Sequence, residues 1–167
     1  IAYAFNDSGS PPANLGGGIV NEGGSPTLAN LTFHDNWGDV GSSFVSSAGN
    51  PELYDSVVDS DFPYPLGVTG GNAVIGNVTV KNGKTGGMII KGGSPFVAAT
   101  FENNDYGGIV VTGGSPTIRS TFKNTTLMGG AAVDISGGTP TVELSSFVGN
   151  TSIDIRVMGG LPVLRDL

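Results

Sequence analysis

The chain contains no cysteine, and only 13% of its 167 residues are charged, against about 25% in an ordinary soluble domain. The lack of cysteine excludes a disulfide framework and a zinc site with cysteine ligands. A single histidine, His34, leaves little material for a histidine metal site or a Ser-His-Asp triad. No apolar run approaches the roughly 18 residues of a membrane span, so we expect no membrane insertion.

Basic residues are also scarce, with seven Lys and Arg against 14 Asp and Glu and a formal net charge of -7. Because a phosphate backbone would be repelled by this charge and no basic cluster offsets it, we expect no nucleic-acid partner. The charges are unevenly distributed along the chain. Residues 1–80 hold eight acids and no base, and residues 81–167 hold seven bases and six acids.

Glycine is abundant, with 29 residues, and much of it lies in a repeated turn. The tetrapeptide Gly-Gly-x-Pro starts at residues 23, 92, 113, 137 and 159, and its prolines lie 69, 21, 24 and 22 residues apart. Since 69 is three times 23, two degenerate copies are expected in the first gap, and residues 49–51 and 70–73 stand where they are needed. The period is therefore about 22 residues, in close to seven copies.

Each copy contains an apolar run, the Gly-Gly turn, a second alternating run, and then Phe and Asn. Such short runs of Val, Ile, Thr and Phe between Gly and Pro are typical of strands. One copy cannot bury its own apolar face, so the copies must stack. We predict an all-β, single-domain parallel β-helix, or β-solenoid, of about seven coils over residues 16–167. Residues 1–15 are expected to be an N-terminal strand, a cap or a donated segment.

The stacked copies predict two columns of side chains. The first is an inward aromatic ladder of Phe33, Phe101, Phe122 and Phe147, with Val58 and Val80 in the two weaker copies. The second is a corner column of asparagines, which tolerate left-handed backbone geometry, at Asn36, Asn82, Asn104 and Asn150.

Two motifs connect the chain to a known repeat. Phe-x-x-Asn occurs at 33–36, 101–104 and 147–150, and paired glycines precede an apolar residue at 17–19, 86–88, 107–109 and 129–131. The combination resembles the right-handed parallel β-helix repeat family, especially the repeats of polymorphic outer membrane proteins, over about residues 16–165. The resemblance implies a right-handed coil and an extracellular or cell-surface protein, in many relatives an adhesin. The same coil also carries polysaccharide lyases and phage tailspikes, so it does not specify a function.

Carboxylates at predicted turns are the first candidates for a site. Asp35, Asp59 and Asp61 follow the strands of neighbouring copies, so two of them could meet across one coil step. Such a pair could bind Ca²⁺ through oxygen ligands or act as an acid and nucleophile in glycoside cleavage. Because Asp is also a common turn residue, we predict no catalytic residue and no cofactor, with Ca²⁺ as the alternative.

Two further sets of residues suit an outer surface. Trp37, Phe62 and Tyr64 lie in the copies that depart most from the consensus, where they could stack on sugar rings or fold back onto the side of the solenoid. Five Asn-x-Ser/Thr sequons are candidates for glycosylation, at Asn6, Asn30, Asn77, Asn124 and Asn150.

The ends of the solenoid are the candidates for self-association. Sequence position is axial position in a solenoid, so the charge asymmetry predicts one acidic and one nearly neutral end, which favours head-to-tail contact. An uncapped end presents unpaired backbone groups, and a heterologous contact between ends propagates into a filament. The residues expected to take part are Ile1, Tyr3, Phe5, Leu161, Val163, Leu164 and Arg165.

These observations predict a non-catalytic, extracellular, structural or adhesive β-solenoid. Its partners would be further copies of itself in a head-to-tail homopolymer, with cell-surface glycans as a second class. The alternative is a carbohydrate-binding or polysaccharide-cleaving β-helix fragment, similar to a tailspike or lyase, that uses the Asp35, Asp59 and Asp61 region and Trp37.

Overall fold

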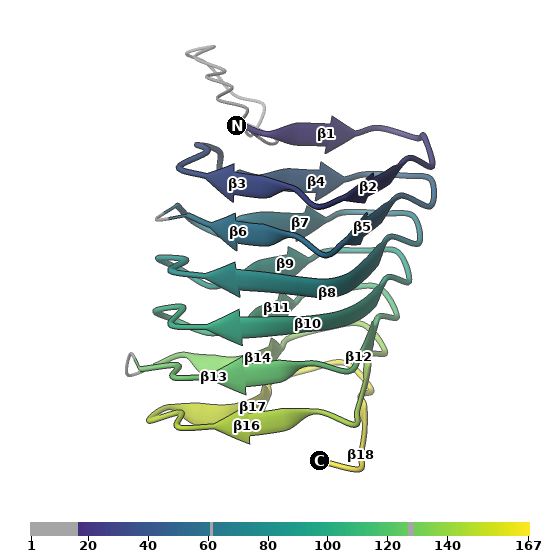
Figure 1. Cartoon of the computed structure of the whole chain (residues 1–167). Helices are drawn as coiled ribbons and strands as arrows, with labels where there is room; N and C mark the ends of the chain where they lie inside the picture. The colour runs from purple at the N-terminus through teal and green to yellow at the C-terminus, as the bar shows by residue number, and fades with distance from the viewer. Residues whose placement is uncertain (1–16, 61, 127–128) are drawn as a thin grey trace.

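The structure of the protein, a computed structural model, describes residues 17–60, 62–126 and 129–167. Within these ranges it has 18 strands and no helix, and the paired strands run parallel. The chain winds through about seven turns of a β-solenoid, so the predicted fold is confirmed (Figure 1). The predicted N-terminal segment, residues 1–15, lies outside the described residues.

A coil contributes up to three strands, which lie in two sheets. The first strands form a seven-stranded sheet, in axial order β1 (Ile19–Asn21), β4 (Phe44–Ser46), β7 (Leu66–Val68), β9 (Met88–Ile90), β11 (Ile109–Val111), β14 (Ala131–Ile135) and β17 (Ile153–Val157). The second strands are β2 (Thr27–Ala29), β5 (Glu52–Tyr54), β12 (Thr117–Ile118), β15 (Thr141–Glu143), β18 (Val163–Arg165) and the first parts of β8 (Val74–Lys81) and β10 (Phe96–Glu102). The third strands are β3 (Thr32–His34), β6 (Val57–Asp59), β13 (Thr121–Lys123), β16 (Ser146–Val148) and the second parts of β8 and β10.

The predicted aromatic ladder is confirmed residue by residue. Its six members are paired in sequence along the third strands, Phe33 with Val58, Val80, Phe101, Phe122 and Phe147. The ring centroids of Phe101 and Phe122 lie 5.4 Å apart, those of Phe122 and Phe147 lie 5.2 Å apart, and both pairs are stacked. The ladder belongs to one hydrophobic core that runs along the solenoid axis.

The predicted geometry of the asparagine corner is only partly right. The left-handed residue of this corner is Asn82 in coil 3, but it precedes the motif asparagine in coils 1 and 4, at Asp35 and Asn103. The asparagine that ends Phe-x-x-Asn instead points inward. Asn104 is 1% exposed, accepts a hydrogen bond from the Gly83 amide and donates one to the Val80 carbonyl, both in the preceding coil.

Asn150 repeats this arrangement two coils further along. It accepts from the Thr125 amide and donates to the Phe122 carbonyl, again in the preceding coil. Asn36 lies in coil 1, above which the described ranges contain no coil. Its side chain is 2% exposed, and neither amide atom has a hydrogen-bond partner there.

Candidate functional site

The C-terminal end of the solenoid is an open sheet edge. Among the described residues, β17 pairs only with β14, and β18 pairs only with β15. Leu164 occupies the inward column that is completely buried at Val142 one coil earlier, yet Leu164 is 43% exposed. Its predicted companions Leu161 and Val163 are exposed as well. This end therefore presents apolar side chains and free backbone groups together.

The N-terminal end has the complementary edge. In the described part of the chain, β1, β2 and β3 each pair with one later strand. The inward residues Ile19 and Leu28 are partly buried. Ile1, Tyr3 and Phe5, predicted to take part in self-association, lie outside the described residues.

Ion pairs between successive coils hold the three arginines of the C-terminal half. Glu143 is bound by Arg119 from the preceding coil, at 2.6 Å, and by Arg165 from the following one. Hydrogen bonds from Arg119 and then Arg165 lower the pKa of the Glu143 carboxyl below its ordinary 4.5. Arg165 at the C-terminal end therefore already has a partner, and the apolar residues around it dominate that surface.

A second candidate surface lies on the outer face of the first sheet. The long corners of coils 1 and 2 place Val40 and Tyr64 on this face, where they pack with the outward-facing Val45 and Ile89. Gly67 makes room for this cover, because a Cβ there would lie 2.9 Å from Cγ1 of Val40. Tyr64 thus follows the predicted alternative of folding back onto the solenoid.

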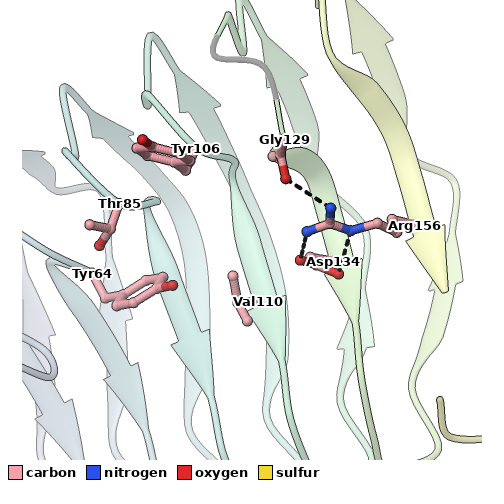
Figure 2. A pocket seen from close by; sticks show the side chains of 8 residues that line it. Tyr64, Thr85, Tyr106, Val110, Gly129, Asp134 and Arg156 are labelled. Carbon is pink, nitrogen blue, oxygen red and sulfur yellow. Dashed lines mark hydrogen bonds and ion pairs between the residues drawn. The ribbon is translucent and has the colours of Figure 1, made fainter. Parts of the chain in front are cut away.

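A pocket of about 250 Å³ opens where this cover ends. Figure 2 shows Tyr64, Thr85 and Tyr106 on one side, Val110 in the middle, and the Asp134–Arg156 pair opposite. The lining is completed by Gly129 and Gly130. Its residues come from six successive coils, and the first sheet holds Val110, Asp134 and Arg156 in register with one another.

The polar groups of the pocket are fixed by hydrogen bonds. The Arg156 guanidinium donates through Nε to Asp134 at 3.2 Å, through its second terminal nitrogen to the same carboxylate, and to the Gly129 carbonyl at 2.8 Å. Burial raises the pKa of Tyr64 above its ordinary 10.0, and the Asp134 carboxylate acts in the same direction. The neighbouring Thr85 side chain acts in the opposite direction and lowers that pKa. The pocket lining is thus nearly neutral, because Asp134 and Arg156 are its charged residues and they pair with each other.

Asp35 and Asp59, the two described members of the predicted carboxylate site, each have a polar partner of their own. Asp35 and Asp59 lie at the same edge of adjacent coils, but Asp35 contacts His34 at 2.6 Å while Asp59 is held by Lys81 at 3.1 Å and Asn82 at 2.6 Å. Burial opposes ionisation of Asp59, but these bonds outweigh it and lower its pKa below 3.8. Asp61 lies outside the described residues, and no group of three or more metal-ligating side chains occurs within them.

The predicted aromatic and glycosylation residues are dispersed over the surface. Trp37 is 43% exposed, Phe62 is half-buried, and of the three aromatics only Tyr64 lines the pocket. The sequon residues Asn30, Asn77 and Asn124 are exposed at corners with positive φ. Asn150 uses its side chain in the inward bonds described above, and Asn6 lies outside the described residues.

The other pocket residues were not predicted from the sequence. Asp134 and Arg156 each interrupt an apolar first strand, and they stand one repeat apart, 22 residues. A search for opposite charges spaced by one period would have found them. Tyr106 follows Phe-x-x-Asn in a single copy and gave no comparable signal.

Comparison of the chain with protein-family models, with curated proteins and with solved structures finds no match. The described residues include no helix that is long and apolar enough to cross a membrane.

Proposed function

We propose that the protein is a non-catalytic structural β-solenoid that assembles end to end at the cell surface or outside the cell. The observation that carries this proposal is the open C-terminal edge, where Leu164 is 43% exposed in a column that is otherwise buried. Full burial of one such side chain stabilises a contact by about 1.5–3 kcal/mol. The pairing of β17 and β18 with a further coil would also satisfy their free backbone groups.

The extracellular location is supported by the exposed sequons Asn30, Asn77 and Asn124. The Phe-x-x-Asn and Gly-Gly motifs support membership of the right-handed repeat family that they resemble. An adhesive role would use the same rod as a scaffold, with glycans as ligands on its side.

Sedimentation velocity over a concentration series tests the assembly. We expect the natural chain to form species of increasing mass as concentration rises, and Leu164→Lys to remain monomeric because a charge is placed in the end contact. Val163→Lys changes only an outward position of the same strand, so it tests the end even where Leu164→Lys fails to fold. Val57→Lys, at a similarly exposed valine on the side of the rod, is the matched control and should assemble normally. Monomers at every concentration would refute the proposal.

A second function, carbohydrate binding, is favoured by the pocket beside Tyr64 and Tyr106. Tyr106 is 49% exposed, and an aromatic ring with neighbouring hydrogen-bonding groups can hold the apolar face and the hydroxyls of a sugar. At about 250 Å³ the pocket is smaller than the roughly 300–1,000 Å³ typical of drug-sized ligands, which suits a single sugar ring.

Titration calorimetry with neutral and uronic-acid oligosaccharides tests this second function. Because the Asp134–Arg156 pair compensates its own charge, we expect a neutral oligosaccharide to bind best. Tyr106→Ala should weaken that binding at least tenfold, and Trp37→Ala should leave it unchanged because Trp37 lies outside the pocket lining. Binding lost with Trp37→Ala but kept with Tyr106→Ala would refute the pocket.

A further inference from the structure

In coils 2 to 7, the last glycine of the turn between the first and second strands must be glycine because its backbone contacts the coil before it. In coils 2 to 7, a Cβ added at this glycine would lie 2.1–2.5 Å from the carbonyl oxygen of the corresponding glycine one coil earlier. These six glycines also have φ between 75° and 79°, a conformation that other residues adopt only with strain. The column comprises Gly49, Gly71, Gly93, Gly114, Gly138 and Gly160.

Coil 1 has the same glycine pair, Gly23 and Gly24, although the described residues place no coil before it. Among the described residues, a Cβ at Gly23 would meet nothing within 4 Å, and one at Gly24 would first meet Oδ1 of Asn21, at 3.2 Å. Neither glycine has a positive φ. The turn of coil 1 therefore has the glycines of a turn that another coil covers. The described residues place no coil there.

The corner that follows the second strand carries an independent sign of the same contact. Asn77 donates through Nδ2 to the Asp55 carboxylate of the preceding coil at 2.6 Å, and both residues have positive φ. In this corner column, coil 1 has Asn30 and coil 7 has Asp166, with φ of 57° and 53°. Both are exposed, and neither side chain has a hydrogen bond within the described ranges. If coil 7 of one copy precedes coil 1 of the next, the asparagine again belongs to the later coil and the aspartate to the earlier one.

We infer that coil 7 of one copy stacks on coil 1 of the next in the register that the internal coils use. This inference rests on the proposed end-to-end assembly and specifies its geometry. Val163 of one copy lies opposite Thr27 of the next, Leu164 opposite Leu28, and Asp166 accepts a hydrogen bond from Asn30. The Gly24 backbone packs against the Gly160 carbonyl, as each later glycine of that column packs against its predecessor.

The same geometry has a consequence for modification. Asn30 is the acceptor of the sequon Asn30-Leu31-Thr32. An N-linked sugar would replace one of the two hydrogens on its Nδ2 and place the bulk of the glycan at the position of Asp166. A chain glycosylated at Asn30 therefore ends the stack instead of extending it.

Cysteine pairs test the register, because these 167 residues contain no cysteine. Neighbouring residues on paired parallel strands are close enough for a disulfide, whose Cα atoms usually lie about 4.4–6.8 Å apart. Under mild oxidation, the double variant Thr27→Cys/Val163→Cys should give a ladder of disulfide-linked oligomers on a non-reducing gel. The double variant Ala29→Cys/Val163→Cys is two residues out of register and should give at least tenfold less. Equal ladders from both would overturn the register.

The Gly24→Ala variant supplies a second, independent readout. Among the described residues its methyl group would first meet the Asn21 side chain, at 3.2 Å, whereas in the stack it also meets the Gly160 carbonyl. We therefore expect a small change in the unfolding midpoint and at least tenfold weaker assembly by sedimentation. Assembly at natural strength would overturn the stacking geometry. The outcomes separate the two proposals: monomers of the natural chain at every concentration refute assembly itself, whereas assembly without the in-register ladder refutes only the register.

Discussion

The aromatic ladder allows stacking between coils to be measured apart from burial. Phe122 is completely buried and stacks on rings above and below it, Phe101 and Phe147. Phe33 occupies the same column and is 5% exposed, but its paired neighbour is Val58, and no ring stacks on it within the described ranges. The substitution Phe→Leu at each position removes similar apolar volume, so the difference between them isolates the two stacked pairs.

The expected difference follows from the two stacks that Phe122 makes. Each stacked aromatic pair contributes about 0.5–1.5 kcal/mol beyond the area it buries. Phe122→Leu should therefore lower the free energy of unfolding by about 1–3 kcal/mol more than Phe33→Leu does. Urea unfolding followed by circular dichroism measures both values. Losses equal to within about 0.5 kcal/mol would contradict the stacking argument, because that is the least one pair contributes.

Two further predictions concern the turns and the ion pairs. Gly71→Ala should lower the free energy of unfolding by about 1–2 kcal/mol or more, because φ is 76° there and the new Cβ would lie 2.4 Å from the Gly49 carbonyl oxygen; an unchanged urea midpoint would refute the backbone contact. The lowered pKa of Glu143 means that its stabilising effect is complete above the ordinary value of 4.5 and is lost as pH falls through the lowered one. The urea midpoint of the natural chain should fall as acid is added below that value, and Glu143→Gln should fall less steeply; parallel curves would show that this carboxylate does not contribute.

The fold was predictable because each copy repeats the same sequence pattern of strands and turns. The Gly-Gly-x-Pro turns fixed the period, and the phenylalanine ladder was predicted in full because a stacked solenoid brings equivalent positions together. The inward turn of Asn104 was not predictable, because the same residue type is common at left-handed corners and only the stacked coil supplies Gly83 and Val80 as partners. The handedness of the coil remains a prediction from the resemblance.

The candidate sites were harder to predict for a physical reason. The end residues Val163 and Leu164 were identified because axial position follows from sequence position. The pocket depends on where irregular corners fold back, and no repeat determines that for Val40 or Tyr64. The Asp35 and Asp59 pair was expected from proximity alone, whereas the structure shows a polar partner for each carboxylate, His34 for Asp35 and Lys81 for Asp59.

Electron microscopy of the natural chain at high concentration tests the central claim, that copies stack through coil 7 and coil 1. Seven coils at the ordinary strand spacing of about 4.8 Å give an axial rise of about 34 Å per copy. The account predicts rods of constant width whose length varies in multiples of that rise, with an unbroken strand spacing across the junctions. Particles all one copy long, or filaments joined side to side, would contradict it.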